Sequence, residues 1–79
     1  MNEELIMLNK FEEDTLWLHK NLDNLRSKFE DKFVAVRDKN VIASGEKIQE
    51  VIQILERKNI NPSFIVIEFV YKKGVELIL

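Results

Sequence analysis

The chain contains no cysteine, only one proline and two glycines among its 79 residues. Without cysteine, neither a disulfide bond nor a thiolate metal site can stabilise the fold. Two isolated glycines cannot build a glycine-rich phosphate loop, which excludes the common nucleotide-binding motifs. The single histidine, His19, has Asp23 one helical turn later, but no second histidine completes a metal site. We therefore expect no metal, no cofactor and no catalytic residues.

A strong net charge and long apolar runs are also missing. The formal net charge is −2, so no overall field attracts nucleic acid or acidic lipid. No apolar run approaches the roughly 20 residues of a membrane helix, and the acidic start of the chain is unlike a signal peptide. We expect a cytoplasmic protein without a membrane partner. Many Glu, Lys and Ile residues with few Gln are typical of thermophilic proteins.

What is present is the composition of one folded domain, with 46% hydrophobic and 33% charged residues. We predict a single domain over residues 1–79, with a helical extension at 1–13 and an α+β core at 14–79. A single core of this size supplies only about 3–5 kcal/mol of stability. The chain must therefore pack tightly or associate with another molecule.

Helical spacing dominates the chain as far as residue 29. Two interpretations remain open: one helix from Glu3 to Lys28, or a helix ending near Glu13 with Asp14 or Thr15 capping a second one. The residues spaced three and four apart along one side are Leu8, Phe11, Thr15, Leu18, Leu22, Leu25 and Phe29.

Two short segments rich in β-branched residues follow, at 33–37 and 40–44. A two-residue loop, Asp38-Lys39, would pair Val36 with Val41 and Val34 with Ala43. Lysine is a poor residue for the positive φ of such a turn, so a longer loop through Asn40 is the alternative.

A second helix is predicted from the apolar spacing of residues 48, 51, 52 and 55. Asn59 suits a left-handed end to this helix, and Pro62 prevents its continuation. Residues 64–71 and 75–79 then form a final hairpin. The predicted order is α-β-β-α-β-β, an α+β fold with two helices packed on one face of a four-stranded antiparallel or mixed sheet.

Several short segments stand out between Trp17 and Leu79: Trp17-Leu18 with Leu22 and Leu25 following, Phe33-Val34-Ala35-Val36, Val41-Ile42-Ala43-Ser44-Gly45, Ile60-Asn61-Pro62 and Val66-Ile67-Glu68-Phe69-Val70. Together they resemble a known family. The family is an uncharacterised prokaryotic one of small domains, known only as a domain of unknown function. It usually has an Asp-Gly hairpin turn where this chain has Asp38-Lys39. The resemblance implies the order of elements, but it brings no activity and no catalytic residues.

Two sets of polar residues are candidate sites. Glu68 and Glu76 share the outer side of the last hairpin, where a carboxylate pair could perform acid–base chemistry, although solubility is the simpler role. Basic residues between 26 and 39, interleaved with Phe29 and Phe33, resemble a single-stranded nucleic-acid surface in composition. Arg37 and Lys39 are the candidate contacts.

Apolar residues near the start of the chain point in several directions, more than one small sheet can cover. The candidate interface residues are Leu5, Ile6, Met7, Leu8, Phe11 and Trp17. We therefore predict a non-enzymatic interaction module that self-associates, most simply as a homodimer. A nucleic-acid-binding or antitoxin-like regulatory partner is the alternative, and a small enzyme is the third and least favoured hypothesis.

Overall fold

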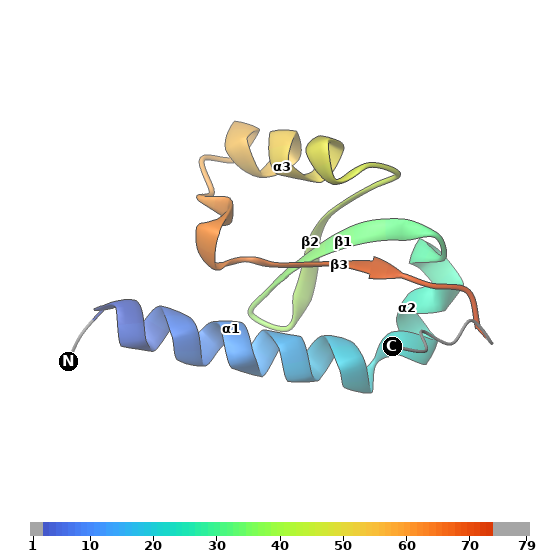
Figure 1. Cartoon of the computed structure of the whole chain (residues 1–79), viewed down its shortest axis with the longest axis horizontal. Helices are drawn as coiled ribbons and strands as arrows, with labels where there is room; N and C mark the ends of the chain where they lie inside the picture. Colours follow the sequence, from blue (N-terminus) through green and yellow to red (C-terminus); the bar gives the residue numbers. More distant parts are fainter. Residues whose placement is uncertain (1–2, 74–79) are drawn as a thin grey trace, which may run out of the picture.

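The computed structural model describes residues 3–73, apart from the side chains of Glu4 and Met7. Its elements form three layers, with one helix above the sheet and two helices below it (Figure 1). In chain order they are α1 (Glu3–Lys20), α2 (Leu22–Phe29), β1 (Lys32–Arg37), β2 (Asn40–Gly45), α3 (Ile48–Arg57), the 3-10 helix η1 (Pro62–Phe64) and β3 (Val66–Val70).

The first helical region is interrupted at Asn21, and neither interpretation of the sequence placed the break there. Helix α1 runs without a break through Asp14 and Thr15, and the Thr15 hydroxyl donates to the Phe11 carbonyl within the helix. At Asn21 the side-chain amide donates to the Trp17 carbonyl over 2.8 Å. An asparagine that competes for backbone groups in this way favours a helix boundary.

Strands β1 and β2 are joined by the two-residue turn Asp38-Lys39. Both residues have positive φ, 52° and 59°, as a type I′ turn requires. The predicted pairing of Val36 with Val41 is confirmed, but the pairing of Val34 with Ala43 is wrong. A bulge leaves Ile42 unpaired and shifts Ala43 opposite Ala35, which moves Ala43 to the other face of the sheet.

The strain at Lys39 leads to a stability prediction. A non-glycine residue in the left-handed region costs roughly 1–2 kcal/mol, part of which the greater flexibility of unfolded glycine offsets. We expect Lys39→Gly to raise the free energy of unfolding by about 0.5–1 kcal/mol in urea denaturation, and Lys39→Val to lower it. A destabilised Lys39→Gly variant would show that the lysine side chain stabilises this turn.

Helix α3 and its end agree with the sequence prediction. Asn59 adopts positive φ, 59°, and the Ile60 amide donates to the Leu55 carbonyl over 2.9 Å. This hydrogen bond is the signature of a left-handed helix end, and Ile60 packs back toward the core. The Asn61 side chain then accepts from the Ser63 amide and begins η1 at Pro62.

The sheet has the order β2-β1-β3, with both neighbouring pairs antiparallel. Strands β2 and β3 therefore run in the same direction on either side of β1. Helix α3 connects them across the top layer, forming a split β-α-β unit.

The sheet has an apolar core on each face. Helices α1 and α2 cover one face, and α3 covers the other. The first core contains Leu18, Leu25, Val34, Val36, Val66 and Val70. The second core contains Ala35, Ala43, Val51 and Leu55, with Ile65 and Ile67 packed against it.

The predicted architecture is therefore wrong in three respects. The described sheet has three antiparallel strands rather than four, and the predicted strand 75–79 lies outside the described residues. The order is helix-helix-strand-strand-helix-strand. Helices occupy both faces, because the side of β3 predicted to face outward with Glu68 also carries Val66 and Val70, which are buried against α1 and α2.

Candidate functional site

One charged side chain is buried in the described part of the chain, the carboxylate of Asp14 in α1. Its residue is only 5% exposed. The two carboxylate oxygens accept from the backbone amides of Asp38 and Lys39 over 3.2 and 2.9 Å. Asp14 therefore connects α1 to the β1–β2 turn. Its carboxylate supplies the hydrogen-bond acceptors for two backbone amides of that turn.

The Asp14 contact was missed by the sequence analysis, which considered Asp14 only as a helix cap. A signal was available, because Asp14 precedes the buried Leu18 by four residues and so shares its face of α1. A carboxylate on a buried helix face needs donors. Which donors it meets depends on where the hairpin turn docks, and that is a tertiary contact.

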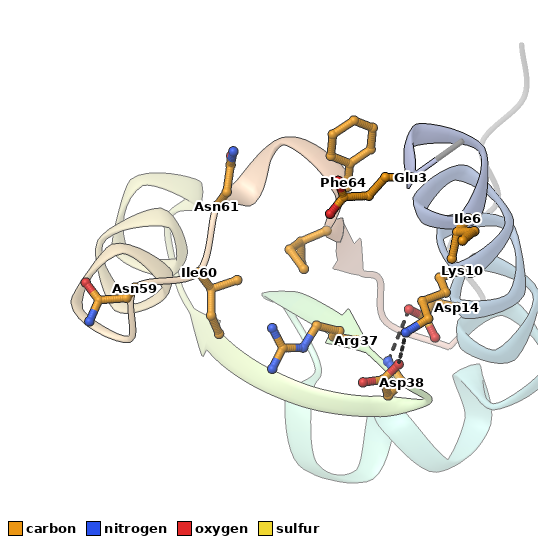
Figure 2. Close-up of a pocket in the computed structure, with 11 residues that line it drawn as sticks. Glu3, Ile6, Lys10, Asp14, Arg37, Asp38, Asn59, Ile60, Asn61 and Phe64 are labelled. Carbon is orange, nitrogen blue, oxygen red and sulfur yellow. Dashed lines mark hydrogen bonds and ion pairs between the residues drawn. The ribbon is translucent and has the colours of Figure 1, made fainter. Parts of the chain in front are cut away.

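A cavity of about 490 Å³ opens beside this contact (Figure 2). It lies between the first half of α1, the end of β1 and the connection from α3 through η1 to β3. Figure 2 shows the Arg37 side chain extending toward Ile60, whereas Lys10 and Asp38 lie together at the α1 side. The lining residues are Glu3, Ile6, Lys10, Asp14, Arg37, Asp38, Asn59, Ile60, Asn61, Phe64 and Ile65.

The charges around the cavity are unevenly paired. Asp14 is bound by the two turn amides, and Lys10 lies 3.9 Å from Asp38. Arg37 forms no ion pair and no hydrogen bond from its side chain with any group that the structure describes. Its guanidinium is therefore the cation at this cavity that remains available to a ligand.

A second polar cluster lies at the other end of the sheet. His19 Nε2 and Glu68 Oε2 are 3.0 Å apart, so α1 and β3 meet there through side chains. Asp23, which the sequence paired with His19, instead accepts from Arg26 over 2.7 Å. The cavity beside the His19–Glu68 pair is lined by His19, Leu22, Arg26, Glu68, Phe69 and Tyr71, none of which is a serine, threonine or cysteine nucleophile.

The His19–Glu68 pair is mainly a surface contact. The two side chains are 53% and 38% exposed, and exposed ion pairs contribute about 0–1 kcal/mol. Glu76, the other predicted carboxylate, lies outside the described residues. Among residues 3–73, no three His, Cys, Asp or Glu side chains gather closely enough to hold a metal ion.

The two candidate nucleic-acid contacts lie at the same end of β1 but in acidic surroundings. Arg37 shares its cavity with the carboxylates of Asp14 and Asp38, and Lys39 lies beside Glu13 as well. Of the other basic residues between 26 and 39, Arg26 is paired with Asp23. Lys32 begins β1 and Arg37 ends it, so these two cations lie at opposite ends of the strand.

The six candidate interface residues have different surroundings. Leu5, Leu8 and Phe11 are exposed on α1, whereas Ile6 lines the cavity beside Arg37. Trp17 is half-buried and packs against the first core. The side chain of Met7 lies outside what the structure describes.

Leu16 was not among the predicted interface residues, although at 60% it has the largest exposed fraction of the large apolar residues that the structure describes. Its neighbours Trp17 and Leu18 turn toward the core, so Leu16 faces away from it. A helix-wheel projection centred on Leu18 would have placed Leu16 on the outer side of α1.

No helix in the described part of the chain is long and apolar enough to cross a membrane.

Fold and site together define a small α+β domain in which a split β-α-β unit carries two preceding helices. The chain belongs to DUF5678, a family of unknown function whose model matches residues 24–73. The resemblance to an uncharacterised family is thereby confirmed. The match begins inside α2, so α1 and its Asp14 contact precede the matched part. No curated protein and no solved structure gives a significant match.

Proposed function

We propose that this protein is a non-enzymatic interaction module that self-associates through the outer side of α1, forming a homodimer. The observation that carries the proposal is the exposure of three leucines on this one helix. Leu5, Leu8 and Leu16 are 53%, 49% and 60% exposed. Leucines exposed together along a helix are typical of a surface that another apolar surface covers.

The positions of these leucines suit a two-fold arrangement. Leu5 and Leu16 are separated by roughly three helical turns, so their side chains lie on the same side of α1. They are placed nearly symmetrically about the middle of the helix. In an antiparallel pair of α1 helices, Leu5 of one copy would therefore face Leu16 of the other, as a two-fold interface requires. The helix dipoles also oppose each other favourably in this arrangement.

We call Leu5, Leu8 and Leu16 the leucine stripe. Glu12 is a polar residue that lies between Leu8 and Leu16 along this stripe. It is exposed and lies on the same side of α1 as Leu5 and Leu16. Burying a carboxylate between two helices opposes association. The stripe is therefore expected to give a reversible dimer rather than a permanent one.

Association is tested by three single substitutions at exposed positions, measured by sedimentation velocity over a range of protein concentrations. Leu16→Glu adds a charge to the stripe, and we expect it to weaken dimerisation by at least about tenfold. Glu12→Leu completes the stripe, and we expect about tenfold tighter dimerisation. Ile48→Glu is the matched control, because Ile48 is a 44% exposed residue of α3 on the opposite side of the molecule.

The proposal fails if the unmodified protein remains monomeric at the highest concentrations, or if Leu16→Glu and Ile48→Glu alter association equally. A monomer that binds another protein through the same leucines would replace the homodimer with a heteromeric complex. Folding of each variant is checked by circular dichroism, and all three positions are exposed enough that little change is expected.

A further inference from the structure

We propose that the cavity beside Arg37 binds a monocarboxylate that carries an apolar group, with the Arg37 guanidinium holding the carboxylate. The free acid of an apolar N-acylated amino acid and the free carboxyl end of an apolar peptide share this chemistry. The proposal does not depend on self-association, because the leucine stripe lies outside the residues that line the cavity.

Arg37 is suited to an anionic group. Arg37 is the last residue of β1, and the next residue, Asp38, donates its backbone amide to Asp14. The backbone of Arg37 is therefore held by the strand on one side and by the turn on the other. Its guanidinium has no partner among the described residues. A planar guanidinium binds a carboxylate through two parallel hydrogen bonds, which a lysine ammonium cannot reproduce.

Apolar side chains line the same cavity, together with the polar ones. Ile6 comes from α1, and Ile60, Phe64 and Ile65 come from the connection between α3 and β3. Phe64 is 37% exposed despite its size. A cavity of about 490 Å³ lies within the range of roughly 300–1,000 Å³ that small-molecule sites occupy. One cation without a described partner, Arg37, beside aliphatic and aromatic side chains suits a ligand with one charged end.

Nearby carboxylates limit the charge of that ligand. Glu3, Asp14 and Asp38 line the same cavity, and only Asp38 has a cationic partner there, Lys10. A phosphate or a dicarboxylate would bring a second negative charge close to them, and like charges repel. A monocarboxylate can place its one charge at Arg37 and its apolar group against Ile60 and Phe64.

Binding is tested by titrating the full chain with two probes that differ only at the carboxylate. N-acetyl-L-leucine carries the carboxylate, and N-acetyl-L-leucinamide replaces it with a neutral amide. Amide chemical shifts in two-dimensional NMR report binding, and we expect residues 59–65 to move with the acid only. N-acetyl-trileucine with a free carboxylate, titrated in parallel, separates a peptide end from a small acid as the tighter ligand.

The variants separate the role of Arg37 from general charge. Arg37→Gln should weaken binding of N-acetyl-L-leucine at least about tenfold, whereas Arg37→Lys should weaken it less. Lys39→Gln is the matched control, because Lys39 is an exposed cation of the same hairpin that does not line this cavity. We expect it to bind like the unmodified protein.

Three results would overturn the proposal. The first is the absence of amide chemical-shift changes at residues 59–65 with either acid up to about 50 mM. Such a result would mean an affinity weaker than that of any specific site. The second is equal binding of the acid and its amide. The third is unchanged binding in Arg37→Gln. Repeating the titration with Leu16→Glu shows that the outcome is independent of self-association.

Discussion

Replacing Asp14 with alanine is expected to lower the free energy of unfolding by about 3 kcal/mol. The substitution removes both side-chain acceptors of the part-buried Asp38 and Lys39 amides. A hydrogen bond to a charged group contributes about 1.5–3 kcal/mol, and an unsatisfied buried donor adds a desolvation cost. Urea denaturation followed by circular dichroism measures the change.

Asp14→Asn distinguishes the hydrogen bonds from the charge. The asparagine side chain keeps one carbonyl oxygen, so we expect it to lose about half as much stability as the alanine variant. Glu13→Ala is the control, because Glu13 is the exposed acidic neighbour on α1. If Asp14→Ala and Glu13→Ala cost the same, the carboxylate contributes nothing specific to the turn.

Leu18→Ala is expected to cost about 2–5 kcal/mol, the range for a leucine deleted from a packed core. Leu18 is 1% exposed and belongs to the core between α1 and the sheet. Leu16→Ala is a closely matched comparison, since it changes the same residue type two positions away in the same helix. Leu16 is 60% exposed, and we expect a change within about 0.5 kcal/mol.

Both leucine variants are measured in dilute protein, so that self-association does not add to the stability of the unmodified chain. Equal losses for Leu16→Ala and Leu18→Ala would mean that α1 does not dock on the sheet through the face containing Leu18. A loss at Leu16 that appears only at high protein concentration would instead support the proposed dimer.

The candidate sites could be only partly inferred from the residues. Arg37 was selected as a cation, but its apolar surroundings at Ile60 and Phe64 come from a segment more than twenty residues later. His19 and Glu68 were each noticed, and their contact at 3.0 Å joins α1 to β3. Composition identifies reactive side chains, whereas their partners depend on how helices dock on strands.

Local features of the fold were within reach of the sequence. The left-handed end at Asn59, the Asp38-Lys39 turn and the Val36–Val41 pairing each depend on a few neighbouring residues, whose backbone preferences are local. Membership of DUF5678 was also foreseeable from short motifs.

Tertiary structure alone decided which helix covers which face of the sheet. Because β3 has apolar residues on both sides, alternation does not identify a single buried face. The extra residue Ile42 in β2 places Ala43 on the face of the sheet that α3 covers. Val34 and Val36 lie on the other face, which α1 and α2 cover. A bulge is chosen by the packing of both layers at once, and that packing has no local signature in the chain.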